Sequence, residues 1–291
     1  MLSVVIPSYK DPYLQRTIDS LLESAEGEIE VIPVLDGYVE ELKEDSRVKA
    51  ILLEKNRGMR GATNAGIEAA KGEFLMKSDS HCAYGKGFDK GLIGEPHWLT
   101  IPRRYSLDEI NWTKDEDRPI KDYHYYTFPA LTNRYGHGMY SLDWPQRGKQ
   151  RAEHVIDDTM TFQGSCWFAN REYFMEHIGF LDDRREAYGS FAVEQLEVGL
   201  KYWLGGGEVK VNKGVWYAHL HKMPRHYKAG MFHKTYKTNK HTVASNVWSA
   251  KHWMNDEEPN MIHKLDWLVE KFWPIPYWPE NWKEVWKSYN L

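Results

Sequence analysis

The stretch EFLMKSDSHC, at residues 73–82, joins an apolar run to a polar segment that carries Asp79, Ser80 and His81. Glu73–Met76 has the composition of a buried strand, and the polar segment begins where this strand is expected to end. Three similar apolar runs precede it in the chain, at Leu2–Ile6, Ile29–Leu35 and Val48–Leu53. Short apolar strands of this kind favour a parallel sheet that is covered on both faces.

Helical patterns separate these runs. Apolar residues recur at helical spacing between Leu14 and Leu22, after Asp11-Pro12, a pair typical of a helix N-cap and first turn. A second helix is expected at Arg60–Ala70, which ends before Gly72. Strands that alternate with helices predict an α/β, Rossmann-like fold with a mostly parallel sheet, whose ligands bind at the carboxyl ends of the strands.

Three polar segments follow expected strands and should converge on one crevice: Pro7-Ser8-Tyr9, Asp36-Gly37 and Asp79-Ser80-His81. Tyr9 could stack on a base, and Asp36 could accept a hydrogen bond from a ring N–H of uracil. In the alternative interpretation Pro7 and Gly37 are turn residues and Asp36 is a cap. The glycine-bearing turn at 56–64 opens a helix, where backbone amides and an arginine suit a pyrophosphate.

Asp79 and His81 are two residues apart at a strand end, so both side chains can turn toward one ion. A carboxylate and an imidazole together suit Mn²⁺, which would act as a Lewis acid on a leaving phosphate. Two solvated loop residues are the alternative.

A second block of motifs lies at residues 162–220. Gly164-Ser165 precedes an apolar strand, and Arg171 opens a helix. Glu194 and Glu197 lie three residues apart near the start of a further helix, where acids could simply favour the macrodipole. Two short strands, at Val209–Val211 and Val215–Ala218, should then deliver His219.

These motifs carry a family resemblance. The first half resembles the nucleotide-sugar domain of GT-A glycosyltransferases of family 2. The middle is similar to the retaining polypeptide N-acetylgalactosaminyltransferases, family 27, over roughly residues 2–250. The matching segments are Asp79-Ser80-His81-Cys82, Gly164-Ser165, Arg171-Glu172-Tyr173-Phe174, Glu194-Gln195-Leu196-Glu197 and Ala218-His219-Leu220-His221.

The resemblance implies a UDP-sugar-dependent, retaining glycosyltransferase that moves a hexose or N-acetylhexosamine to a hydroxyl. It implies that Asp79, His81 and His219 hold Mn²⁺ or Mg²⁺, and that Asp79 and Glu194 act in catalysis, with Glu194 on the sugar. The nucleotide-sugar would contact Pro7, Tyr9, Asp36, Gly58, Arg60, Asn64, Gly164, Ser165 and Glu194. Gln195 and the segment 191–193 depart from the family pattern, which leaves the identity of the sugar open.

Charge distribution bears on the acceptor. The chain of 291 residues has a formal net charge of −4, yet residues 209–251 hold nine Lys or Arg and no acid. The segment could serve only the donor's diphosphate, or it could bind a polyanion such as DNA. The second interpretation suggests glycosylation of hydroxymethylated pyrimidine in DNA, a phage-type modification. A peptide or protein Ser/Thr acceptor is the rival, and a silent nucleotide-sugar or nucleic-acid binding module is the non-enzymatic alternative.

The remaining features concern organisation. We expect a catalytic domain at 1–250, with an insertion at about 103–160 bordering the acceptor groove. A Trp-rich helical extension follows at 251–291, where six tryptophans should pack on the sheet or form a dimer contact. The sequence shows no apolar run of membrane-spanning length and no secretion signal, and it has two cysteines. These features predict a cytoplasmic enzyme, in the host cytoplasm if the protein is phage-encoded, with no membrane partner.

Overall fold

A computed structural model describes residues 1–129, 138–189, 191, 193–221 and 240–288 of the chain. Its main feature is a ten-stranded sheet whose path runs β10-β12-β6-β11-β4-β1-β2-β3, with β5 paired to β12 and β7 to β6. The strands are β1 (Leu2–Ser8), β2 (Ile29–Asp36), β3 (Ile51–Leu53), β4 (Phe74–Ser78), β5 (Cys82–Tyr84), β6 (Trp98–Asp108), β7 (Thr113–Asp115), β10 (Ile156–Asp158), β11 (Cys166–Asn170) and β12 (Glu208–His219). A separate two-stranded sheet pairs β8 (His124–Tyr126) with β9 (Ser141–Asp143).

Most strand pairs along the path of the main sheet are parallel. β1 pairs in parallel with β2 and β4, β2 with β3, and β6 with β12, whereas β11 runs antiparallel between β4 and β6. The α/β class and its predominantly parallel sheet are therefore as predicted. β3 is shorter than expected, because Val48 makes only an isolated bridge to Val31 before the strand begins at Ile51.

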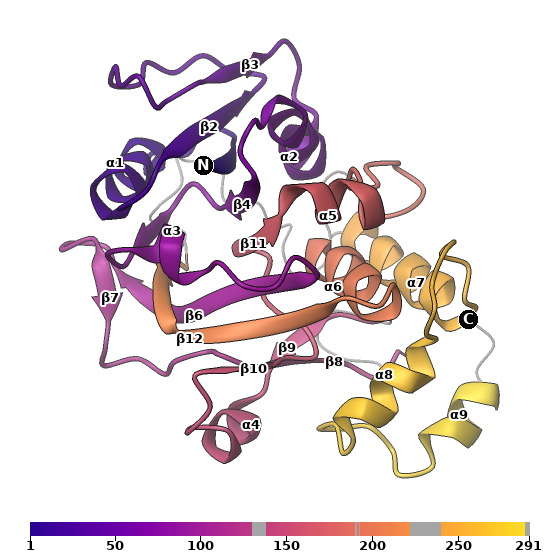
Figure 1. The fold of residues 1–291 in the computed structure, drawn as a ribbon. Coiled ribbons are helices and arrows are strands. Elements are labelled where there is room, and N and C mark those ends of the chain that lie inside the picture. The colour runs from indigo at the N-terminus through magenta and orange to yellow at the C-terminus, as the bar shows by residue number, and fades with distance from the viewer. Residues whose placement is uncertain (130–137, 190, 192, 222–239, 289–291) are drawn as a thin grey trace.

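Helices cover both faces of the sheet (Figure 1). On one face α1 (Leu14–Ser24) and α3 (Phe88–Gly91) pack on apolar side chains of β1, β2 and β11. On the other face α2 (Gly58–Ala69), α5 (Arg171–His177) and α6 (Glu194–Leu204) pack on β1, β4, β6 and β12. Successive residues of each central strand therefore enter different cores, which explains why these strands are apolar throughout.

The expected insertion at 103–160 contains the end of β6 and all of β7 and β10, which belong to the main sheet. Only the stretch between β7 and β10 projects from that sheet, and it carries β8, β9 and α4 (Pro145–Gln150). His219 is delivered by one strand, β12, whose pairing with β6 shifts register between Asn212 and Trp216, rather than by the two short strands expected.

Most tryptophans of the C-terminal segment pack on the rest of the chain, whereas Trp273 is 39% exposed. Trp253, Trp278 and Trp282 are buried in the core that also holds α6, and the Trp278 indole donates to the Tyr126 carbonyl at 2.7 Å. Figure 1 shows α7 (Lys240–Met254), α8 (Leu265–Phe272) and α9 (Trp282–Ser288) grouped beside α6. α7 continues across position 250, so the expected boundary there falls inside a helix. No helix in the described ranges has the length and apolar character needed to cross a bilayer.

An ion pair between buried Asp157 and Arg151, whose side chain is 38% exposed, links the projecting stretch to the sheet and gives a pH-dependent prediction. Asp157 of β10 accepts hydrogen bonds from Arg151 at 2.7 and 2.8 Å and from the Tyr123 hydroxyl at 2.8 Å. Burial alone would raise the pKa of Asp157, but the Arg151 and Tyr123 contacts lower it to about 2. Because the pKa of an unfolded Asp is about 3.9, this pair stabilises the fold above about pH 4. The stabilisation is lost as the pH falls toward the folded pKa.

We therefore expect Asp157→Asn to lower the melting temperature at neutral pH, by a difference that shrinks as the pH falls from about 4 to about 2. Thermal melts across this range check it, with exposed Glu280→Gln as the control. A difference from the parent protein that stays constant with pH would contradict this role of Asp157.

Candidate metal and nucleotide site

Asp79, His81 and His219 meet at the carboxyl ends of β4 and β12. Each offers one ligand atom, and these atoms all lie within 4.8 Å of one another. His219 Nε2 is 3.2 Å and His81 Nε2 is 4.0 Å from Asp79 Oδ2, and the two imidazole centroids are 4.9 Å apart. The structure thus brings together three residues that are up to 140 positions apart in the sequence.

The donor set fits a divalent transition ion. Burial lowers the pKa of His219 to about 3, so its imidazole is neutral, which is the form that binds metals. Burial would raise the pKa of Asp79, but the charge of Lys77 holds it well below its usual range, so the carboxylate is ionised. One carboxylate oxygen with two imidazole nitrogens is a set that suits Mn²⁺. The three ligand roles themselves remain predictions.

Asp11 orients His81, a role that the sequence analysis missed. The Asp11 carboxylate is buried, and its Oδ2 lies 2.9 Å from His81 Nδ1 and accepts from the Ser80 hydroxyl at 2.8 Å. With the Nδ1 proton directed to Asp11, the lone pair of His81 is on Nε2, which faces Asp79. Asp11 is not the N-cap of α1, because that helix begins at Leu14 with Tyr13 as its cap residue.

We expect Asp11→Ala to weaken Mn²⁺ binding by about 10- to 100-fold, because carboxylates that orient a metal-binding imidazole typically contribute this much. Electron paramagnetic resonance of free Mn²⁺ during a titration measures the affinity. Asp19→Ala is the control, since Asp19 lies on α1 and pairs with Lys43 instead. Equal Mn²⁺ affinity in the parent protein and Asp11→Ala would contradict the role of Asp11.

Lys77 links the metal-binding carboxylate to Glu194. It is 2% exposed, and its ammonium donates to Asp79 Oδ1 at 2.6 Å and to the Gly164 carbonyl at 2.5 Å. Glu194 Oε2 lies 3.2 Å away on its other side. Because Lys77 takes Oδ1 of Asp79, the second oxygen, Oδ2, is left facing the two imidazoles. Lys77 therefore fixes how Asp79 is presented.

Glu194 begins α6 and is buried beneath this ammonium. Its Oε1 accepts the indole N–H of Trp167 at 2.6 Å. Val193, which precedes it, has a left-handed backbone with φ of 42°. Gly164 lies so close that an added Cβ would come within 3.2 Å of Glu194 Oε2. The Ser165 carbonyl accepts the backbone N–H of Asp79 at 2.8 Å. The side of the triad that faces β11 is thus lined by Glu194, Gly164 and Ser165.

At the β1 side, Tyr9 is the residue best placed to meet a base. It follows β1, its side chain is 49% exposed, and its ring packs edge-on against Tyr38 at 5.9 Å. Pro7, two residues earlier, is buried in β1 opposite Val34. A ligand could therefore reach Pro7 only at the end of the strand. Stacking of a base on Tyr9 remains a prediction.

Asp36 and Gly58 form a turn within the chain. The Asp36 carboxylate accepts from the Asn56 amide and from the backbone N–H groups of Arg57 and Gly58, at 2.6–2.9 Å. Asp36 is 2% exposed, so its oxygens face these donors. These contacts agree with the alternative of a capping role for Asp36, and its contact with uracil stays a prediction. Gly58 has φ of 78°, a conformation that glycine adopts without strain, at the first turn of α2.

Arg60 and Asn64 point away from the predicted phosphate position. The Arg60 guanidinium is fully buried, pairs with Glu197 of α6 and lies over the Tyr188 ring. Asn64 exchanges two hydrogen bonds of 2.8 Å with the backbone of Leu181. Both residues lie on the face of α2 that packs against the chain, because an α-helix turns positions 60 and 64 to one side. Both side chains are thus engaged within the chain, and their contact with a diphosphate stays a prediction.

The basic segment 209–251 lies only partly within the described residues. Lys210 pairs with Asp158 and Glu208, and Lys213 donates to the carbonyls of Arg151 and Ala152. These two cations stabilise the fold and are not available for a polyanion. Lys222, Arg225, Lys228, Lys234 and Lys237 lie outside the described residues, as does the side chain of Lys240.

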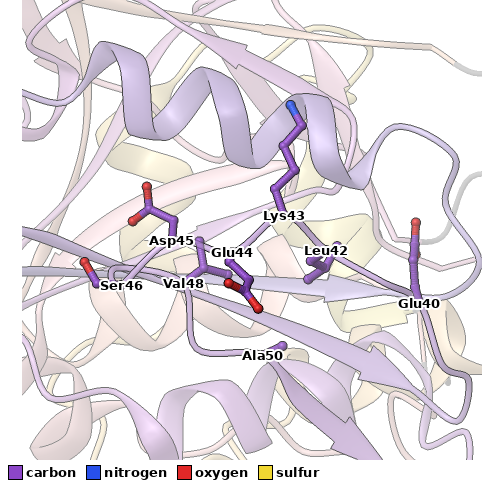
Figure 2. A pocket seen from close by; sticks show the side chains of 8 residues that line it. All are labelled: Glu40, Leu42, Lys43, Glu44, Asp45, Ser46, Val48 and Ala50. Atoms are coloured by element: carbon purple, nitrogen blue, oxygen red, sulfur yellow. The ribbon is translucent and has the colours of Figure 1, made fainter.

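An open depression lies elsewhere, in the segment between β2 and β3 (Figure 2). Its lining is acidic, with Glu40, Glu44 and Asp45, and the Lys43 ammonium is bound to Asp19 at 2.6 Å. An acidic lining repels a diphosphate, and none of the predicted site residues contributes to it. The depression is therefore not the nucleotide site.

Comparisons with known proteins place the chain in a family. The model of Glycosyl transferase family 2 matches residues 3–178. The chain is 27% identical over 236 residues to polypeptide N-acetylgalactosaminyltransferase 3 of Mus musculus, covering 72% of this chain and 35% of that protein. It is 24% identical over 273 residues to polypeptide N-acetylgalactosaminyltransferase 11 of Xenopus tropicalis, covering 85% and 42%. The chain thus spans less than half the length of these relatives.

A crystal structure of GalNAc-T7 with UDP, GalNAc and Mn²⁺ has the same fold. The TM-score is 0.66 at 19% sequence identity, over 88% of this chain and 49% of that one. The family model covers more than half of the chain, including Asp79 and His81, whereas β12 with His219 follows the matched residues. The chain is therefore a GT-A-fold member of glycosyl transferase family 2.

Proposed function

We propose that this protein is a metal-dependent glycosyltransferase that uses a UDP-sugar. The observation that carries the proposal is the convergence of Asp79, His81 and His219 at the strand ends, with Lys77 and Glu194 directly behind them. These three residues would hold Mn²⁺ or Mg²⁺, which when bound neutralises charge on a departing diphosphate. Tyr9 would stack on the uracil, and Glu194 would face the sugar.

The chain's own residues would perform the remaining tasks. Asp11 keeps the lone pair of His81 directed toward the site, and Lys77 keeps Oδ2 of Asp79 directed there. Because these side chains are fixed before the donor binds, little reorganisation is needed when charge develops on the leaving group. The structure of GalNAc-T7 contains UDP, GalNAc and Mn²⁺, which supports a donor and an ion of this kind.

Screening nucleotide-sugars for hydrolysis tests the proposal without any acceptor. We expect UDP release from at least one UDP-sugar among UDP-GalNAc, UDP-GlcNAc, UDP-glucose and UDP-galactose. The release should stop in EDTA and return with Mn²⁺. GDP-mannose is the control donor, because it lacks uracil. No release from any UDP-sugar, or release that persists in EDTA, would contradict the proposal.

We also propose that the anomeric configuration is retained. An inverting enzyme needs a carboxylate base on the face opposite the leaving group. The Asp79 and Asp143 carboxylates are held in ion pairs that lower their pKa values below the usual range, and Glu194 contacts Lys77 and Trp167. The ion pairs make the Asp79 and Asp143 carboxylates poor bases, and both oxygens of the Glu194 carboxylate are engaged by Trp167 and Lys77. An α-linked product from an α-linked donor, identified by its anomeric NMR coupling constant, is the expected result, and a β-linked product would contradict it.

For the acceptor we propose a hydroxyl in DNA, such as hydroxymethylated pyrimidine, on the basis of the cations concentrated in 209–251. A Ser/Thr hydroxyl of a peptide is the second candidate, favoured by the similarity to polypeptide N-acetylgalactosaminyltransferases. Transfer of radiolabelled sugar to hydroxymethylated DNA or to Ser/Thr peptides distinguishes the two. Label in the peptide alone would overturn the first candidate.

A further inference from the structure

A group of basic side chains lies next to the triad, on the side of the triad that faces away from Tyr9. Arg104 of β6 is 4% exposed, and its Nη2 hydrogen-bonds to His221 Nε2 at 2.5 Å. His221 follows β12, and its ring centroid is 5.2 Å from that of His219. Lys121 donates its backbone N–H to the Arg104 carbonyl. Arg104, Lys121 and His221 together form a basic cluster.

Arg104 and Lys121 bring two positive charges to the basic cluster, whereas burial lowers the pKa of His221 to about 4 and keeps its imidazole neutral near pH 7. The carboxylate nearest to the cluster is Asp143 of β9, which lies 2.5 Å from Lys121 Nζ but 4.0 Å from Arg104 Nη1. His124 of β8 also contacts Asp143, at 2.8 Å. Arg104 Nε is buried and has no hydrogen-bond partner among the residues that the structure describes. A buried donor without a partner costs about 1–3 kcal/mol, and an anion would supply the missing acceptor.

The sheet order places this cluster on the side of the acceptor rather than the nucleotide. From β4, which leads to Asp79, the strands β1 (followed by Tyr9) and β2 lie in one direction along the sheet, and β6 with Arg104 and β12 with His219 lie in the other. β8 is joined to the start of α6 by the Tyr126 hydroxyl, which donates to the Gln195 carbonyl at 3.3 Å. Gln195 directly follows Glu194, the residue proposed to face the sugar. A group bound by the basic cluster would therefore lie beyond the sugar, where the acceptor must enter.

We propose that Arg104, Lys121 and His221 bind a phosphate group of the acceptor, beside the hydroxyl that receives the sugar. This inference rests on the proposed function and deepens it, because it assigns acceptor recognition to residues that are separate from the metal ligands. Arg104 supplies a fixed, desolvated guanidinium whose planar donors match phosphate oxygens. Lys121, 33% exposed at its side chain, supplies a second charge at the rim.

Binding of a charged and an uncharged oligonucleotide tests this inference. The probes are fluorescein-labelled octathymidylate and its analogue with neutral methylphosphonate linkages, added to protein saturated with UDP and Mg²⁺ so that donor phosphate sites are filled. Fluorescence anisotropy should show at least about 10-fold tighter binding of the charged probe. Lys121→Gln and His221→Phe should each remove most of this difference and leave UDP affinity within about twofold. These two variants leave the buried Arg104 unchanged. Lys90→Gln, at an exposed position of α3, is the matched control.

Three results would overturn the inference. Equal binding of both probes, or binding of neither, would exclude phosphate recognition. Loss of UDP affinity in Lys121→Gln and His221→Phe with unchanged probe binding would assign the cluster to the donor's diphosphate. UDP-sugar hydrolysis is measured on the same samples: if it persists while phosphate recognition fails, the inference is wrong and the proposed function stands. If it is absent, the proposed function itself fails.

Discussion

Alanine at Asp79, His81 or His219 is expected to lower metal-stimulated UDP release by at least about 100-fold. Removing one stabilising group for developing charge typically reduces a rate by about 10²- to 10³-fold, and each of these residues supplies one of the three converging ligand atoms. UDP release from the best donor, with and without Mn²⁺, measures the effect.

His97→Ala is the matched control for these variants, because His97 is half-exposed and lies outside the triad. Its Nε2 is 3.8 Å from Glu208 Oε2. Circular dichroism and thermal melts establish that each variant is folded, which matters most for the buried His219. Full activity in folded His219→Ala would show that His219 is not a ligand of the metal.

Lys77→Met should lower both the free energy of unfolding and the affinity for Mn²⁺. Without the ammonium, the Asp79 and Glu194 carboxylates face each other with no opposite charge, and breaking a buried ion pair costs about 3–5 kcal/mol. Asp79 is partly exposed, so the lower end of that range, about 3 kcal/mol, is expected. Mn²⁺ binding weakens because nothing then fixes Oδ1 of Asp79. Urea denaturation and a Mn²⁺ titration measure the two effects.

A double-mutant cycle isolates this contact. Glu194→Gln removes one of the two carboxylates, so the double variant Lys77→Met/Glu194→Gln should be more stable than the sum of the single effects predicts, by about 1 kcal/mol or more. Lys90→Met, at an exposed position of α3, should leave stability nearly unchanged. Strict additivity would show that Lys77 and Glu194 do not interact.

The sequence predicted the first half of the fold because its strands and helices are locally consistent. β1, β2 and β4 are short apolar runs with breaks at their ends, and the observed strands extend those runs by only one or two residues. The meeting of His219 with Asp79 was expected from the motif resemblance, since local patterns cannot reveal contacts between residues 140 positions apart.

Where side-chain contacts in the structure differ from those expected, the cause is side-chain direction. A glycine turn followed by Arg60 and Asn64 has the composition of a phosphate site, but helical phase turns both residues toward α6 and the loop at Leu181. Asp36 is a polar residue at a strand end, and the turn itself uses its oxygens. Lys77 could have been found, because a lysine inside an otherwise apolar strand must have charged partners. The role of Asp11 in orienting His81 was missed, because an aspartate at this position more commonly caps a helix.

Titration of Mn²⁺ with and without UDP, followed by the resonance signal of the free ion, tests the central claim most directly. If Asp79, His81 and His219 hold an ion that in turn holds the diphosphate, the protein binds one Mn²⁺ and UDP tightens that binding. By linkage Mn²⁺ tightens UDP binding by the same factor, and His219→Ala loses both effects. UDP that binds equally well in EDTA, or Mn²⁺ affinity that does not change with UDP, would contradict the metal-bridged site.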